Sequence, residues 1–204
     1  MDERELEAAA AELIEQKRYP DAEDLLRGVH DEAIRNNQAD LAICALQELI
    51  HIYVIQERLS DHERCQLEIE KLEDSAWSFV ASSWFYLYSK QDFEAAIAKA
   101  DRAIGKAQAE GDTSAAYTAR AARGRALINL ERPAEAEEVL TEMLAMVSQR
   151  MKLVPGDELG FLELAHSKGI SRRTVAEILK IVRPYYREQG FIDRGAELAE
   201  KLGI

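Results

Sequence analysis

Apolar residues recur at helical spacing through most of this chain, in pairs of segments joined by short turns. In residues 3–17 the apolar positions fall three and four apart, which predicts an amphipathic helix. Residues 41–57 are apolar around most of their circumference, which is typical of a helix covered on several sides. No segment alternates apolar and polar positions over the length of a strand. The pattern therefore predicts an all-α chain.

A short turn signature repeats along this pattern. It consists of an aromatic residue or a proline, two further residues and a small residue. There are three clear copies and, in the gap between them, a degenerate one: Tyr19–Ala22, Phe93–Ala96, Pro133–Ala136 and the degenerate Leu59–His62. Along the chain the final positions of the four copies are separated by 40, 34 and 40 residues. A repeat of this length predicts stacked helical hairpins, with the small residue buried where the paired helices meet.

These residues resemble the tetratricopeptide repeat (TPR) family, whose hairpins carry small residues at the helix crossing and an aromatic residue near the turn. The resemblance extends over roughly residues 3–151. It implies an all-α, right-handed stack of TPR-like hairpins, an alpha solenoid. The fit is weakest where Ile50 and His62 replace small residues in the second copy and where Trp84 does so in the third. An unrelated helical bundle is therefore the competing interpretation.

The strongest break in the chain is Val154-Pro155-Gly156-Asp157. It predicts two parts: about four hairpins in residues 1–153 and a three-helix C-terminal cap in residues 154–204. Phe191 and the helix after it would close a degenerate fifth hairpin.

The TPR resemblance also implies a protein or peptide partner, bound on the concave face that the first helix of each hairpin lines. Aromatic side chains at helical spacing often serve only to pack neighbouring helices, so a core role for Phe85 and Tyr88 is the alternative. Carrying the family alignment over gives these partner-binding candidates: Glu7, Gln47, His51, Phe85, Tyr88, Arg125 and Asn129.

A second signal follows the break, where residues 164–182 look like a bacterial helix-turn-helix. The small residue, turn glycine and two apolar positions of that motif match Ala165, Gly169, Val175 and Ile178. Residues 166–187 contain six basic residues and one acidic residue. The basic candidates for contact with nucleic acid or with an acidic partner are Arg172, Arg173, Arg183 and Arg187. A solvated basic face on a capping helix pair is the competing interpretation.

Composition narrows the functional classes. The net charge of −12 argues against non-specific binding to nucleic acid or to an anionic membrane. The start of the chain lacks the features of a signal peptide, and no run of apolar residues is long enough to span a bilayer. Cys44 and Cys65 are expected to be reduced thiols in a cytoplasmic protein.

The sequence offers little for catalysis. The four histidines form no zinc-ligand pattern, and there is no phosphate-binding glycine loop or nucleophile elbow. Cys44, Glu48 and His51 share a helix face but are interpreted as a stripe rather than a metal site. We therefore expect no catalytic residues, metal or cofactor. The sequence favours a non-catalytic adaptor or regulator that binds a protein or peptide, and the alternative is a transcriptional regulator that contacts DNA through residues 164–182.

Overall fold

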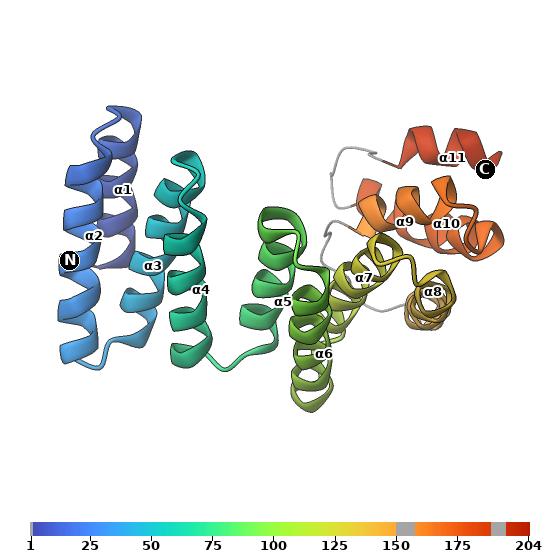
Figure 1. The fold of residues 1–204 in the computed structure, drawn as a ribbon, viewed down its shortest axis with the longest axis horizontal. Coiled ribbons are helices and arrows are strands. Elements are labelled where there is room, and N and C mark those ends of the chain that lie inside the picture. Colours follow the sequence, from blue (N-terminus) through green and yellow to red (C-terminus); the bar gives the residue numbers. More distant parts are fainter. Residues whose placement is uncertain (1, 150–157, 189–194) are drawn as a thin grey trace. The chain divides into compact units, whose positions relative to one another are not determined.

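The computed structural model describes residues 2–149, 158–188 and 195–204, and every regular element within these ranges is a helix. The helices form two compact units, named here unit 1 (residues 1–74) and unit 2 (residues 75–204). The helices of the four hairpins pack against their partners in the chain (Figure 1). The expectation of an all-α stack of TPR-like hairpins is confirmed.

Unit 1 contains two hairpins. The second helix of the first hairpin packs against the first helix of the second, and the two first helices also touch each other. Its core is built around Leu6, Leu26, Ile52 and Tyr53. The helices are α1 (Glu3–Glu15), α2 (Tyr19–Arg35), α3 (Ala39–Ile55) and α4 (Leu59–Leu72).

Unit 2 contains two further hairpins, followed by three more helices. The first of these, α9, packs against α7, and α10 packs against α8 and α9. The helices on both sides of the predicted break thus belong to one compact unit, while the break itself lies outside the described residues. The elements are α5 (Ala76–Phe85), the π-helical turn η1 (Tyr86–Lys90), α6 (Phe93–Glu110), α7 (Thr113–Asn129), α8 (Pro133–Ser148), α9 (Glu158–Ser167), α10 (Arg172–Glu188) and α11 (Ala196–Leu202).

The turns inside the four hairpins share a left-handed residue at the same position, although a π-helical turn precedes it in the third. A residue with positive φ precedes the N-cap of the second helix, at Lys17 (58°), Glu57 (56°), Gln91 (53°) and Glu131 (58°). Non-glycine residues rarely adopt this left-handed conformation, so its recurrence at equivalent positions marks a structural repeat. The residue that ends each sequence signature lies four positions after the N-cap in all four copies.

That position is buried in every copy. Ala22, Ala96 and Ala136 are 0% exposed and His62 is 8% exposed. The prediction that the three alanines are buried at the helix pairs is confirmed. The degenerate second copy is thus a genuine hairpin in which a larger side chain occupies the crossing, and burial lowers the pKa of His62.

A glycine permits the close approach of α9 to α7. A Cβ atom on Gly124 would lie 2.2 Å from Cζ of Phe161, whose ring is fully buried. No L-residue fits there unless the ring moves, so Gly124 fixes how the C-terminal helices dock on the hairpins of unit 2.

Candidate functional site

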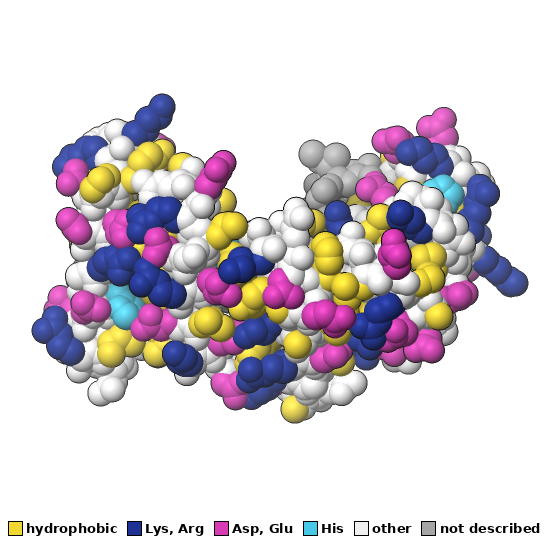
Figure 2. Space-filling model, viewed as in Figure 1, with side chains coloured by type: hydrophobic (Ala, Val, Ile, Leu, Met, Phe, Trp, Pro, Cys, Tyr) yellow, Lys and Arg dark blue, Asp and Glu magenta, His cyan; other side chains and the backbone are white. Residues whose placement is uncertain are grey.

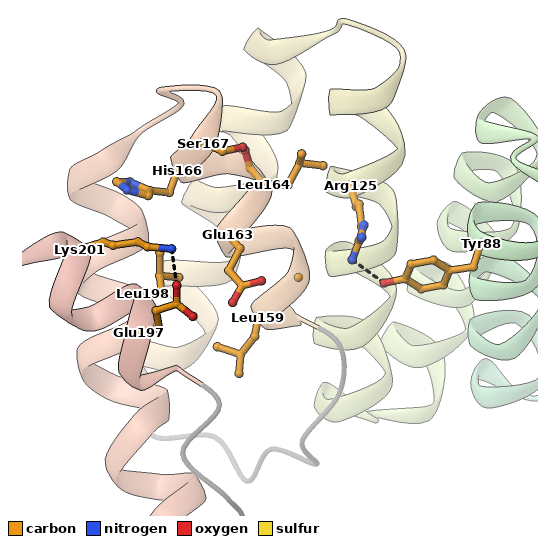
Figure 3. Close-up of a pocket in the computed structure, with 11 residues that line it drawn as sticks. Tyr88, Arg125, Leu159, Glu163, Leu164, His166, Ser167, Glu197, Leu198 and Lys201 are labelled. Carbon is orange, nitrogen blue, oxygen red and sulfur yellow. Dashed lines mark hydrogen bonds and ion pairs between the residues drawn. The ribbon is translucent and has the colours of Figure 1, made fainter.

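A cleft of unit 2 has a volume of about 790 Å³ and is bordered by η1, α7, α9 and α11 (Figure 3). Its floor is apolar, with Leu159 and Leu198 nearly buried and Leu164 half-buried. The walls carry polar and charged side chains. An apolar floor with a few polar groups above it is typical of a binding site.

An exposed aromatic residue forms one wall of this cleft. Tyr88 is 44% exposed and stacks on Trp84, with ring centroids 5.5 Å apart and an angle of 13° between the rings. The guanidinium carbon of Arg125 lies 4.7 Å from the centre of the Tyr88 ring, and Arg125 donates a hydrogen bond to the Tyr88 hydroxyl. The prediction named both residues, and the structure brings them together.

Two further charged groups face the opposite side. Lys201 donates a hydrogen bond to Glu197 at 2.7 Å, which ties two residues of α11 together. Figure 3 shows Glu163 of α9 between this pair and the Arg125–Tyr88 pair. Burial lowers the pKa of Arg125, and the negative charge of Glu163 partly opposes that shift. The sequence analysis did not identify Glu163, because its importance depends on the packing of α9 against α7.

Unit 1 contains a separate cleft of about 410 Å³ between α1 and α3, with the end of α4 at its edge. Two more of the predicted residues, Glu7 and Gln47, line it and are exposed. Cys44 lies at its base, where burial and the nearby carboxylates raise the pKa of the thiol to about 11. An unreactive, buried thiol is the result.

The remaining groove candidates have other surroundings. Phe85 is 5% exposed and packs edge-to-face on Tyr86, which corrects the expectation that its side chain faces a groove. Asn129 is exposed, but its amide donates to the backbone carbonyl of Arg125 at 2.9 Å. His51 is an exposed residue of α3.

The helix-turn-helix-like segment has the core expected from its spacing. Ala165, Val175 and Ile178 are 0% exposed, and Gly169 has a φ of 70°. Its contacts at the start of α10 are internal to unit 2. The Ser171 hydroxyl donates to Glu137 of α8, and Arg172 donates to the backbone carbonyl of Lys201 at 3.1 Å. Of the other basic candidates, Arg173 and Arg187 are exposed and Arg183 is half-buried.

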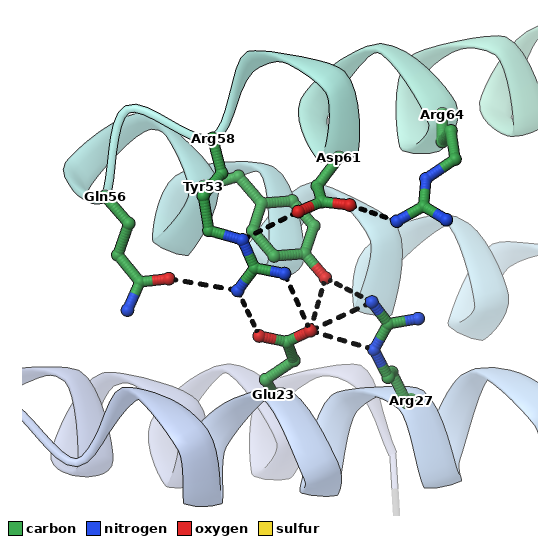
Figure 4. A network of polar contacts seen from close by, with 7 residues as sticks. All are labelled: Glu23, Arg27, Tyr53, Gln56, Arg58, Asp61 and Arg64. Carbon is green, nitrogen blue, oxygen red and sulfur yellow. Dashed lines mark hydrogen bonds and ion pairs between the residues drawn. The ribbon is translucent and has the colours of Figure 1, made fainter.

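A polar network in unit 1 was not anticipated from the sequence (Figure 4). Glu23 of α2 accepts hydrogen bonds from Arg58 at 2.6 Å, from Arg27 at 2.9 Å and from the Tyr53 hydroxyl at 3.0 Å. The hydrogen bond from Arg58 is the main reason why the pKa of Glu23 falls to about 2. Arg58 also binds Asp61, so the network joins the two hairpins of unit 1.

Part of this network has a signal in the sequence. In three of the four copies an arginine immediately precedes the turn signature and binds the acid three residues later. These are the pairs Arg18–Asp21, Arg58–Asp61 and Arg132–Glu135. Asp92 holds the equivalent place in the third copy and caps α6 through the backbone N–H of Ala95.

Two kinds of site have no candidate in the described ranges. No cluster of three or more His, Cys, Asp or Glu side chains there is placed to hold a metal ion. None of the described helices is long and apolar enough to cross a bilayer.

Comparison with known proteins places the fold. No family model matches the sequence, and no curated protein matches it. Among solved structures, the chain is similar to a candidate kinesin light chain of Podosopora anserina, crystallised as nearly identical TPR-like repeats. The match has a TM-score of 0.63 at 11% sequence identity and covers 92% of this chain and 96% of that one. The resemblance to TPR-like repeats is therefore confirmed at the level of the fold.

Proposed function

We propose that this protein is a non-catalytic, cytoplasmic adaptor or regulator that holds a peptide segment of a partner protein in the unit 2 cleft. The observation that carries the proposal is the wall formed by Tyr88 and Arg125 above an apolar floor. An exposed tyrosine already fixed by stacking loses little conformational freedom when a partner covers it. Tyrosine and arginine are also the side chains that most often dominate the energy of protein interfaces.

The cleft in unit 1 supports the same kind of function on a second surface. Glu7 and Gln47 project from the first helices of two successive hairpins, which is the face that the TPR resemblance assigns to partner binding. His51 and Asn129 belong to the same proposed set of first-helix contacts.

The proposal is tested by selecting peptides from a randomised linear library on the full-length protein and measuring their affinity. Tyr88→Ala should weaken binding about tenfold or more, because truncating a central aromatic contact commonly costs about 2 kcal/mol. Ile181→Ala is the matched control, since Ile181 is similarly exposed in the same unit but does not line the cleft. Circular dichroism would check that both variants keep their helices. Selected peptides that bind both variants equally well would contradict the proposal.

DNA binding through residues 164–182 is the second candidate. It is favoured by the burial of the motif's apolar positions and by the exposed arginine Arg173 near the start of α10. The test is duplex binding at two salt concentrations by the wild type and by the Arg172→Ala, Arg173→Ala double variant. We expect no sequence-specific binding by either protein. Nanomolar, sequence-dependent binding that is lost in the double variant and falls steeply with salt would favour the regulator instead.

A further inference from the structure

Within the described residues, two of the charged groups in the unit 2 cleft form hydrogen bonds with neighbouring side chains, and a third does not. Lys201 is bound to Glu197 at 2.7 Å, and Arg125 lies on the ring of Tyr88 and donates to its hydroxyl. Glu163 forms no hydrogen bond or ion pair with any residue that the structure describes, although its negative charge acts at longer range on both Arg125 and Lys201. Its carboxylate lies between the two partnered groups, in the middle of the cleft (Figure 3).

The position of this carboxylate restricts what the cleft can hold. In the free protein Glu163 is exposed, so water solvates its charge at little cost. A ligand that covers the cleft removes that water. An apolar ligand would desolvate the carboxylate without supplying a hydrogen bond, and an acidic ligand would place a second negative charge beside it. A cationic ligand replaces the lost water with a charge-assisted hydrogen bond.

The surroundings of Glu163 suit a long basic side chain in particular. The nearly buried Leu159 and Leu198 form the cleft floor beside it, at a place where the aliphatic stem of a lysine or arginine can lie. The cationic end group would then reach the carboxylate.

We propose that the unit 2 cleft recognises a peptide segment through a lysine or arginine side chain, whose charged end binds Glu163 and whose stem packs on Leu159 and Leu198. The inference rests on the proposed function, because it names the chemistry of the peptide bound at the same cleft. Glu163 is then a specificity-determining residue of the cleft.

The experiment uses the peptides selected on the full-length protein. We expect them to be enriched in lysine or arginine at one position, and we expect norleucine at that position to weaken binding, because it keeps the stem and removes the charge. Glu163→Gln should weaken the basic peptide about tenfold, as expected for the loss of a hydrogen bond between charged groups. Glu163→Lys should shift the preference to a peptide that carries glutamate at the same position.

Glu138→Gln provides the matched control. Glu138 is an exposed glutamate of α8 in the same unit, outside the cleft lining. The substitution changes the net charge of the protein by the same amount as Glu163→Gln, so a loss seen in both variants would reflect long-range attraction and overturn the proposed contact. Repeating the measurements at higher salt would separate that attraction from the direct bond.

The two proposals fail in distinguishable ways. If the selected peptides depend on Tyr88 but bind Glu163→Gln as well as the wild type, or carry no basic residue, this inference is overturned and the peptide-binding function stands. If no selected peptide depends on Tyr88, both are overturned.

Discussion

Units 1 and 2 repeat the same hairpin turn but carry very different surfaces. Both use a left-handed residue before the N-cap and bury the residue four positions after it. Unit 1 contains 20 acidic and 8 basic residues, so it carries the whole net charge of −12, whereas unit 2 contains 18 of each and is neutral. The same hairpin turn thus recurs in both units, and the charge of the surface varies independently of it.

The two units also differ in one of the contacts that hold their helices together. In unit 1, a network of half-buried and exposed ions centred on Glu23 links α2 to the start of α4, and Figure 2 shows acidic and basic side chains side by side on that face. In unit 2, the ring of Phe161 lies directly on the backbone of Gly124. The contact around Glu23 in unit 1 is therefore polar, whereas the contact of Gly124 with Phe161 in unit 2 is a close apolar fit.

The tryptophans allow the two units to be followed separately. The chain contains two, Trp77 and Trp84, and both belong to unit 2. Tryptophan fluorescence during urea unfolding therefore reports on unit 2, while far-UV circular dichroism reports on the helices of both units.

The largest expected effect is that of Gly124→Ala, which tests the apolar fit of unit 2. The added Cβ would collide with three atoms of the buried Phe161 ring, at 2.2, 2.5 and 2.7 Å. We expect unit 2 to lose about 3 kcal/mol of unfolding free energy, at the upper end of overpacking effects. The measurement is the urea midpoint of tryptophan fluorescence.

Gly105→Ala is the control for this prediction. Gly105 lies in the interior of α6, and a Cβ there would meet nothing within 4 Å. The same substitution should therefore raise the stability of unit 2, by up to about 1 kcal/mol, because alanine favours the helix. A similar loss in both variants would show that the contact between Gly124 and Phe161 does not determine the stability of unit 2.

Glu23→Gln tests the charge pairing of unit 1 and should cost about 2 kcal/mol at neutral pH, as is typical for hydrogen bonds to a charged group. The pKa of Glu23 lies near 2 in the folded protein, below its ordinary value of 4.5, mainly because of the hydrogen bond from Arg58. Folding is therefore stabilised by this group above pH 4.5, and that contribution disappears as the pH falls toward 2. The stability difference between wild type and variant should narrow over the same range, as measured by circular dichroism in urea.

Glu23→Gln should also affect the two spectroscopic signals differently. The circular dichroism transition should shift more than the tryptophan transition, because the lost contacts all lie in unit 1. Equal shifts of both signals would mean that the units unfold together and that the difference in their packing has no separate energetic consequence.

The repeat was predictable because it is local. The signature around Ala22, Ala96 and Ala136 specifies a turn and a crossing within a few residues, and burial at those positions followed from it. The cleft was only partly predictable. Tyr88 and Arg125 emerged from the family alignment, whereas Glu163 depends on how α9 docks at Gly124, a contact between residues far apart in the chain.

The wrong prediction for Phe85 and the absence of any prediction for the network around Glu23 have the same cause. A sequence pattern does not show how deeply a side chain is buried. Phe85 and Tyr88 lie three positions apart, so the pattern predicts partner binding for both, although Phe85 is buried and Tyr88 is exposed. The polar groups around Glu23 come from α2, from α3 and from the N-cap of α4, and no short motif combines all three.

The smallest expected effect compares two copies of one local ion pair within unit 1. Arg18–Asp21 and Arg58–Asp61 have the same spacing at equivalent turns, but the first pair is 56% and 55% exposed and the second 37% and 19%. Asp21→Asn should change the unfolding free energy by less than about 0.5 kcal/mol, since water and salt screen an exposed pair. Asp61 also binds Arg64, and its partner Arg58 is held by Glu23, so Asp61→Asn should cost about 1 kcal/mol. Urea midpoints from circular dichroism would separate the two variants. Equal losses would mean that the network around Glu23 adds nothing to the local pair, and that the charge pairing of unit 1 acts through isolated local pairs rather than through a network.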